Sequence, residues 1–186
     1  MHALRRTAPR AACLLWICLG AALMVACSST QGARPIPPVA AVELPRFMGD
    51  WYVIAHIPTF PERHAWDAVE SYSLRDDGRI ATTFRYRKGS FDAPLKTLHP
   101  VGTVRPGTGN AIWGMQFVWP IQAEYVIVHV EPDYSQTIVG RSARDYAWVM
   151  ARTPQISEQD YQRHLQRLRE LGYDLGKLRR VPQSER

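Results

Sequence analysis

Hydrophobic and polar residues alternate along short segments of the chain from Leu44 onwards. Within residues 79–88, for example, Ile80, Thr82 and Phe84 fall on one face, and Thr83 and two arginines fall on the other. A period of two is typical of a half-buried β-strand, and turn residues separate the segments at intervals of roughly ten residues, as in a sandwich or barrel. The pattern predicts eight strands, over residues 49–57, 68–74, 79–88, 95–104, 111–119, 124–130, 136–141 and 146–152.

The pattern changes to a helical one near the C-terminus. Ser157 can cap a helix, Leu165 and Leu168 lie on one stripe, and Gly172 is a natural helix end. No helix is predicted between the eight strands, so consecutive strands are expected to pair antiparallel. We therefore predict an all-β fold, an eight-stranded antiparallel up-and-down β-barrel with one C-terminal α-helix. Such a barrel has room for side chains or one small ligand.

The first 26 residues have the pattern of a bacterial export signal. Three arginines precede an apolar run over residues 11–26, and the chain then turns abruptly polar. The run is shorter than the roughly 20 apolar residues that a membrane-spanning helix needs. We predict a signal peptide over residues 1–26, with an uncleaved signal anchor as the alternative.

A cysteine stands at the end of this apolar run. Residues 23–27, Leu-Met-Val-Ala-Cys, resemble the lipobox of bacterial lipoproteins. The resemblance implies that Cys27 carries a diacylglycerol thioether and that a third acyl chain is added to the new N-terminus. Three acyl chains exceed the two signals needed for stable anchoring. We expect residues 27–43, rich in proline, to be a lipidated flexible tether, and residues 44–186 to be the folded domain.

Charge and cysteine content change when the predicted signal is removed. The 186 residues carry a net charge of +6 and 3 cysteines. Removing residues 1–26 takes away three arginines, no acidic residue and two cysteines, so the net charge falls to +3 and Cys27 alone remains. A nucleic-acid partner, an internal disulfide and thiol catalysis are therefore not expected.

Three motifs occur in the order found in lipocalins. Gly49-Asp50-Trp51-Tyr52 resembles the opening Gly-x-Trp-Tyr of that family, residues 71–78 resemble the second strand and first hairpin of its bacterial and apolipoprotein D-like branch, and residues 144–154 resemble the last strand of that branch. With the lipobox, the chain resembles the bacterial outer-membrane lipoprotein lipocalins. The resemblance implies a barrel floor in which Arg152 stacks on Trp51, with Gly49 as a further structural residue. Residues 130–134 depart from the family's usual Thr-Asp-Tyr-like run.

Strand alternation from these landmarks predicts which side chains line the cavity. If Trp51 points inward, so do Val53 and Ala55, and the resemblance places Tyr72 inward as well. Glu70 lies two residues before Tyr72 and therefore points to the same face of the strand. A carboxylate in an apolar barrel needs a partner or a raised pKa. Glu70 therefore either orients a polar ligand head or shows that this strand is assigned to the wrong face. The predicted ligand-binding residues are Val53, Glu70, Tyr72, Leu74, Trp113, Met115, Phe117, Trp119, Trp148 and Met150.

An aromatic, flexible and largely apolar lining predicts a single-chain lipid as ligand. The predicted function is binding and transport or storage of fatty acids or lysophospholipids by a lipid-anchored protein of the outer membrane, with the domain facing the periplasm. No catalytic residue, metal site or cofactor is predicted, because the histidines have no metal-ligand spacing and the serines no nucleophile motif.

Two alternatives stay open: a structural envelope lipoprotein with an incidental cavity, and a binder of another hydrophobic ligand such as a tetrapyrrole with His129 as axial ligand. Members of this branch can also pair through the open barrel end, which allows a homodimer.

Overall fold

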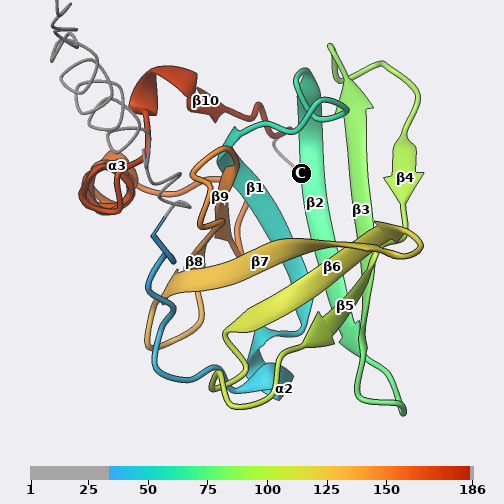
Figure 1. The fold of residues 1–186 in the computed structure, drawn as a ribbon. Helices are drawn as coiled ribbons and strands as arrows, with labels where there is room; N and C mark the ends of the chain where they lie inside the picture. The colour runs from blue at the N-terminus through green and yellow to red at the C-terminus, as the bar shows by residue number, and fades with distance from the viewer. Residues whose placement is uncertain (1–33, 185–186) are drawn as a thin grey trace, which may run out of the picture. The chain divides into compact units, whose positions relative to one another are not determined.

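The computed structural model describes residues 34–184, which belong to one compact unit that begins at Ala33. The predicted signal segment and Cys27 lie outside the described residues. The strands are β1 (Gly49–Ile57), β2 (Ala65–Leu74), β3 (Ile80–Lys88), β4 (Lys96–Leu98), β5 (Val101–Val104), β6 (Ile112–Val118), β7 (Ile121–Val130), β8 (Gln136–Gly140), β9 (Ala147–Ala151) and β10 (Arg179–Arg180). They pair antiparallel in the order β1-β2-β3-β5-β6-β7-β8-β9, and β9 pairs with β1, so the sheet closes into a barrel (Figure 1).

The barrel wall is formed by strands at the eight places along the chain where strands are predicted. The predicted strand over residues 95–104 is divided into β4 and β5, because Pro100 lies between them and offers no backbone N–H to the ladder. The other seven predicted strands are present with ends shifted by up to three residues. The predicted all-β barrel with a C-terminal helix is confirmed.

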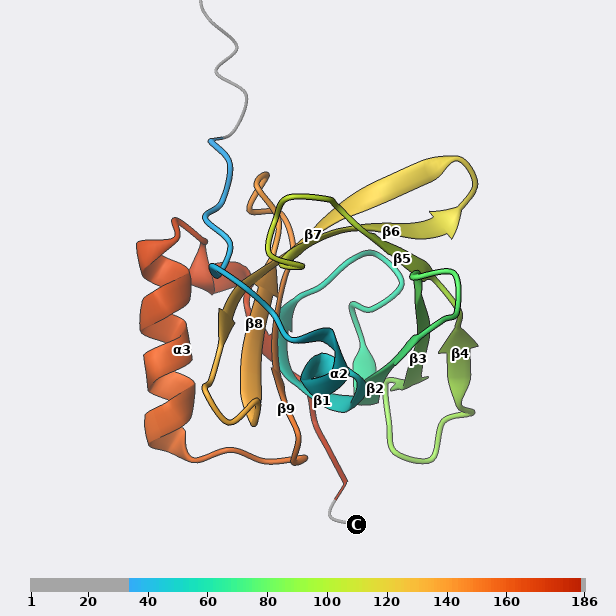
Figure 2. The ribbon, with the colours of Figure 1, turned by 90° about the horizontal axis from the view of Figure 1, so that it is seen from below.

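Short helical elements complete the unit. α2 (Leu44–Phe47) lies across the lower end of the barrel, and α3 (Glu158–Glu170) packs outside its wall (Figure 2). As predicted, the Ser157 side chain caps α3, accepting a hydrogen bond from the Asp160 N–H at 3.0 Å. A 3₁₀ turn, η1 (Leu175–Lys177), follows. No helix within residues 34–184 has the length and apolar character to cross a membrane.

The buried residues form two clusters on opposite faces of the barrel wall. One fills the barrel and includes Trp51, Trp113 and Tyr72. The other lies between the wall and α3, and includes Ile138 and Leu168. The wall is therefore apolar on both faces where the helix covers it, which explains the continuous apolar runs in several strands.

The C-terminal segment after η1 fills a gap in the barrel wall. β1 pairs with β2 only from Gly49 to Tyr52, and further up β1 pairs instead with β10. Beyond β10 the Gln183 side-chain amide donates to the carbonyls of Val53 and Ala68, at 2.8 and 3.0 Å, and so bridges β1 and β2.

The chain before α2 also packs on the barrel. Ile36 and Val42 are each 2% exposed, and the Val39 N–H donates to the Ile127 carbonyl at 2.9 Å. The prediction of a flexible tether is therefore wrong from Ile36 onwards, because apolar side chains between the prolines find sites on the wall. The part of the predicted tether before Arg34 lies outside the described residues.

Candidate ligand-binding site

The lower end of the barrel is closed by an arginine stacked on a tryptophan. The Arg152 guanidinium lies 3.7 Å from the ring centre of Trp51. It donates to the carbonyls of Asp50, Met48 and Arg46 at 2.7, 2.8 and 2.8 Å. Because these carbonyls come from α2 and the start of β1, the guanidinium ties the last strand to the first.

Gly49 is required in this floor by its backbone conformation. Its φ is +93°, a conformation in which a side chain is strained. This accounts physically for the Gly-x-Trp spacing.

Aromatic rings fill the lower half of the barrel above this floor. Trp113 stacks on Tyr125 with ring centres 4.9 Å apart, and Phe47 and Tyr72 meet the edge or face of Trp113 at 5.5 and 5.7 Å. This part of the interior is packed core, with Trp51 and Trp113 fully buried.

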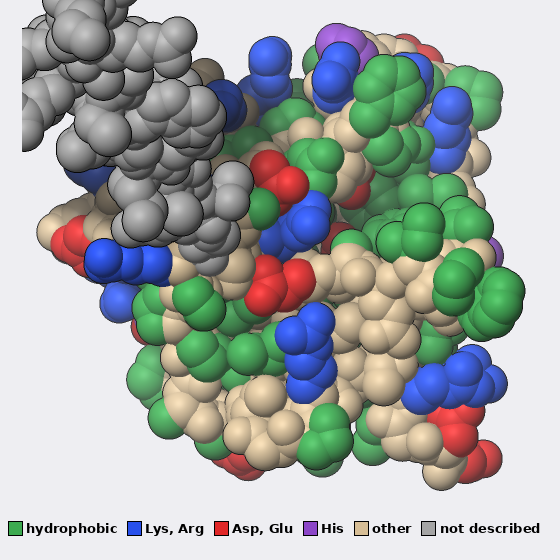
Figure 3. All heavy atoms as spheres, in the orientation of Figure 1, with side chains coloured by type: hydrophobic (Ala, Val, Ile, Leu, Met, Phe, Trp, Pro, Cys, Tyr) green, Lys and Arg blue, Asp and Glu red, His purple; other side chains and the backbone are tan. Residues whose placement is uncertain are grey.

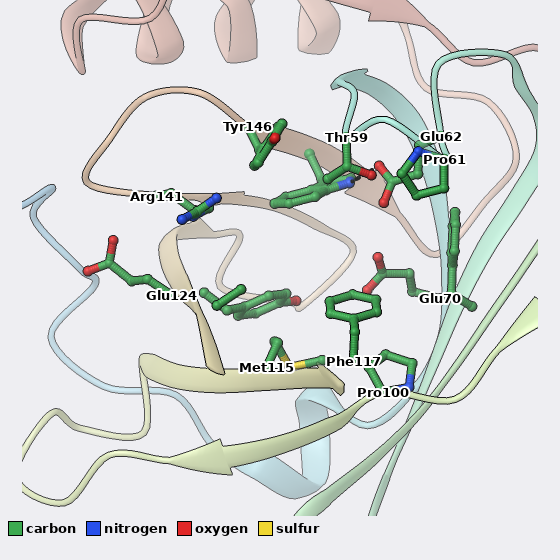
Figure 4. Close-up of a pocket in the computed structure, with 14 residues that line it drawn as sticks. Thr59, Pro61, Glu62, Glu70, Pro100, Met115, Phe117, Glu124, Arg141 and Tyr146 are labelled. Atoms are coloured by element: carbon green, nitrogen blue, oxygen red, sulfur yellow. Dashed lines mark hydrogen bonds between the residues drawn. The ribbon is translucent and has the colours of Figure 1, made fainter. Parts of the chain in front are cut away.

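The upper half of the barrel holds a cavity of about 320 Å³. Its walls are mostly apolar, and Figure 4 shows the side chains converging on it from several strands and two loops. The lining residues are Thr59, Pro61, Glu62, Glu70, Phe84, Pro100, Met115, Phe117, Ala123, Glu124, Tyr125, Arg141, Tyr146 and Trp148. The volume lies at the lower end of the roughly 300–1,000 Å³ of ligand pockets.

A chain of hydrogen bonds marks the bottom of the cavity. The Tyr72 hydroxyl donates to Glu70 Oε2, and the hydroxyls of Tyr72 and Tyr125 are 2.7 Å apart. The single O–H of Tyr72 is used in the hydrogen bond to Glu70, so in the second hydrogen bond the Tyr125 hydroxyl is the donor and the Tyr72 oxygen the acceptor. Burial raises the pKa of Glu70 to about 7, against the lowering effect of the Tyr72 hydrogen bond, and burial raises the pKa of both tyrosines.

A second buried carboxylate lies in the loop between β1 and β2. Glu62 is 4% exposed, accepts a hydrogen bond from Trp148 Nε1 at 3.0 Å, and has its Oε2 atom 3.6 Å from His56 Nδ1. The strand pattern gives no signal for Glu62, because it is a loop residue that folds back into the barrel mouth.

Exposed apolar side chains surround the open end. Phe60 in the β1–β2 loop is 78% exposed, and Val118, Trp119 and Ile121 at the β6–β7 turn are 68 to 81% exposed. Figure 3 shows hydrophobic side chains gathered over the end of this hairpin, beside a hollow in the surface. An apolar entrance thus leads to an apolar cavity.

The chain is similar to known proteins over most of its length. The family model described as "Lipocalin-like domain" matches residues 42–183. The chain belongs to the lipocalin family. Lipocalins generally bind and transport small hydrophobic molecules rather than catalyse reactions, so this lipocalin is a binding or transport protein for such ligands.

Named relatives and solved structures cover most of this lipocalin. It is 31% identical over 157 residues to "Outer membrane lipoprotein Blc" of Citrobacter freundii, covering 84% of this chain and 88% of that protein. It is 27% identical over 164 residues to "Temperature-induced lipocalin-1" of Arabidopsis thaliana, covering 79% and 82%. Insecticyanin from the tobacco hornworm Manduca sexta shares the fold with a TM-score of 0.64 at 15% identity, covering 81% of this chain and 85% of that one.

The predicted cavity residues of this lipocalin lie in three environments: the cavity lining, the packed core and the surface. Glu70, Met115, Phe117 and Trp148 line the cavity. Val53, Tyr72, Trp113 and Met150 point into the barrel but belong to the packed core. Leu74 and Trp119 do not line the cavity, being 48% and 81% exposed.

These last two placements, and that of Ala55, correct the predictions. Leu74 ends β2 at the closed end, beyond the core, and Trp119 follows a register shift between Met115 and Val118. Ala55 belongs to the cluster under α3, because a bulge between Val53 and Ala55 reverses the alternation of β1. The same bulge brings His56 to the inner side.

His129 lies outside the barrel interior. Its ring centre is 5.8 Å from that of His164 on α3, and its Nε2 atom is 3.0 Å from Glu131 Oε1. The alternative of a tetrapyrrole ligated by His129 in the cavity is therefore wrong. No group of three or more potential metal ligands comes together within residues 34–184.

Proposed function

We propose that this lipocalin is a lipid-binding lipoprotein of the outer membrane that stores or transports fatty acids or lysophospholipids in its barrel cavity. The observation that carries the proposal is the cavity itself, about 320 Å³ with mostly apolar walls, left open above a barrel floor that is otherwise densely packed. A single acyl chain suits this shape, because burying each methylene contributes about 0.8 kcal/mol. The exposed apolar residues at the mouth support entry of such a chain there.

The membrane anchor in this proposal is Cys27, with residues 1–26 as the signal peptide. The lipobox-like residues 23–27 support it, as does the name "Outer membrane lipoprotein Blc" of relatives at 25 to 31% identity. In proteobacterial lipoproteins, a residue other than Asp after the lipidated cysteine favours sorting to the outer membrane, and Ser28 at this position supports that localisation. In the proposal the domain faces the periplasm. A homodimer stays a prediction from the resemblance alone.

A titration tests ligand binding. The chain without residues 1–26, with Cys27→Ser, is titrated with a fluorescent fatty acid and then with palmitate and lysophosphatidylethanolamine as competitors. We expect saturable binding at micromolar or lower concentration and displacement by at least one competitor. Ala123→Trp fills the cavity and should abolish binding, while Ala40→Trp, on the exposed segment before α2, should leave it unchanged. Absence of saturable binding by the folded delipidated protein contradicts the proposal.

Fractionation tests the anchor separately. The full chain and its Cys27→Ala variant are expressed in a Gram-negative host, and envelope fractions are probed for the protein. We expect the parent chain in the outer membrane and the variant in the soluble periplasmic fraction. If the variant still partitions wholly with the outer membrane, Cys27 is not the anchor.

One observation favours the alternative of a structural lipoprotein with an incidental cavity. The lower half of the barrel is filled by its own aromatic side chains, including Trp113, Tyr125 and Phe47. The same titration separates the two functions, since a structural lipoprotein needs no saturable ligand.

A further inference from the structure

The polar groups of the cavity are unequally distributed between its sides. Figure 4 shows the carboxylates of Glu62 and Glu70 on one side, both directed towards the cavity, while Arg141 and Glu124 lie on the other. Arg141 Nη1 is 3.1 Å from Asp145 Oδ2, and Glu124 accepts hydrogen bonds from Ser142. Both charges opposite the two carboxylates therefore have a partner, although the buried Nε atom of Arg141 has none among the described residues.

The two carboxylates have few partners for their burial. Both residues are less than one-tenth exposed. Glu70 accepts a hydrogen bond from Tyr72, and Glu62 accepts one from Trp148. A carboxylate can accept about four hydrogen bonds, so acceptor capacity remains on the side facing the cavity.

Among the described residues no cation lies beside Glu70, because Arg141, which also lines the cavity, is on the opposite side. The groups that face it are Tyr72 from its own strand, Tyr125 from β7 and Glu62 from the β1–β2 loop, while β3 and β6 present the uncharged Phe84 and Met115. An anionic group brought beside Glu70 would meet like charge in an apolar surrounding, where Coulomb repulsion is poorly screened. A hydrogen-bond donor or a cation would find an acceptor there.

We propose that Glu62 and Glu70 determine the ligand specificity of the cavity, favouring single-chain amphiphiles whose buried polar end is an amine or another hydrogen-bond donor over those whose buried end is an anion. This inference rests on the proposed lipid-binding function and deepens it. Among the two ligand classes, it favours lipids with an ammonium-bearing head over free fatty acids at alkaline pH. At acidic pH the protonated Glu70 can share a hydrogen bond with a carboxyl group, so the discrimination against fatty acids is expected to shrink.

Three ligands with the same chain and different polar ends test this inference. Dodecylamine, dodecanol and dodecanoate are titrated below their micellar concentrations into the chain without residues 1–26, with Cys27→Ser, at pH 8.5 and pH 5.5. At pH 8.5 we expect affinity to decrease from the amine to the alcohol to the acid. The acid should bind at least about tenfold more weakly than the alcohol, a difference of about 1.4 kcal/mol. At pH 5.5 the gap between acid and alcohol should narrow.

Variants identify the groups responsible. Glu70→Gln and Glu62→Gln keep the shape of the side chain and remove its charge. In at least one of these variants, the affinities for the acid and the alcohol should differ by about threefold or less. Glu170→Gln, an exposed change of the same charge at the end of α3, is the matched control and should keep the parent order. Circular dichroism verifies that each variant is folded.

The outcomes separate the inference from the proposed function. Saturable binding in which the acid binds as well as the alcohol at pH 8.5, or an order unchanged in both cavity variants, overturns the specificity inference and leaves the lipid-binding function standing. No saturable binding of any of the three ligands overturns both.

Discussion

Replacing Arg152 should remove much of the stability of the barrel floor. In the Arg152→Ala variant, the carbonyls of Asp50, Met48 and Arg46 each lose a charged donor at 2.7 to 2.8 Å, and Trp51 loses the guanidinium 3.7 Å above its ring. Hydrogen bonds to charged groups contribute about 1.5–3 kcal/mol each, and a cation–π contact about 0.5–2 kcal/mol. Water can reach part of this site and replace some of the donors, so we expect a total loss of about 4 kcal/mol, below the sum of these values.

Two further variants separate charge from geometry. Arg152→Lys keeps the positive charge but offers a compact ammonium in place of the planar fork, so it should recover only about half of the loss. Arg85→Ala removes a half-buried arginine that lies 3.4 Å from Asp50 Oδ2 and donates to Ser71 Oγ at 2.9 Å. It should cost about 1 kcal/mol, since solvent screens the pair.

Urea unfolding followed by far-ultraviolet circular dichroism measures these differences. The free energy of unfolding is extrapolated to zero urea, and an unchanged dependence on urea shows that the unfolded state is the same in all variants. The reasoning is refuted if Arg152→Ala is no less stable than Arg85→Ala. Full recovery by lysine would refute the role given to the fork geometry.

Two other predictions concern pH and packing. Burial raises the pKa of Glu70 to about 7, so between pH 4.5 and 6.5 the folded protein binds a proton at Glu70 that the unfolded chain has released, and stability falls as pH rises. Burial lowers the pKa of His164 to about 4, so over the same range the unfolded chain binds a proton at His164 that the folded protein lacks, and stability rises with pH. The two effects offset each other in the parent protein. Urea unfolding of Glu70→Gln should therefore show stability rising with pH over this range, and that of His164→Gln should show it falling, by up to about 1.4 kcal/mol per pH unit; flat profiles in both would contradict the linkage. Gly140→Ala should lower the melting temperature by several degrees, because its Cβ would lie 2.3 Å from the Tyr173 hydroxyl and overpacking costs about 1–3 kcal/mol. An unchanged melting temperature would contradict this close approach.

The alternation of residues predicts the barrel well because most of its strands keep one face buried over their whole length. Ile80, Thr82 and Phe84 in β3 are buried as their period of two requires. The prediction fails where a bulge interrupts the period, as between Val53 and Ala55 in β1. No glycine or proline marks this bulge, so the sequence carries no signal for it.

The sequence pattern also does not predict how far along the barrel axis an inward-pointing side chain lies. Periodicity indicates that Trp113 and Met115 both point inward, but it does not indicate that Trp113 stacks on Tyr125 and belongs to the packed core while Met115 lines the cavity. Packing between strands far apart in the sequence decides this. The burial of Glu62 cannot be predicted from the sequence pattern either, because a loop residue has no alternation of buried and exposed positions to indicate it.

The pairing of β1 with β9 constrains how the chain can fold. The first strand bonds to residues near 150 and 180, and Gln183 closes the remaining gap between β1 and β2. Such long-range pairing makes ring closure slow, and the ring cannot close until β9 has been synthesised. Strands β2 to β8 can assemble earlier as a curved sheet with two open edges, so the intermediate before closure is the species in which strand edges are free to pair with another chain.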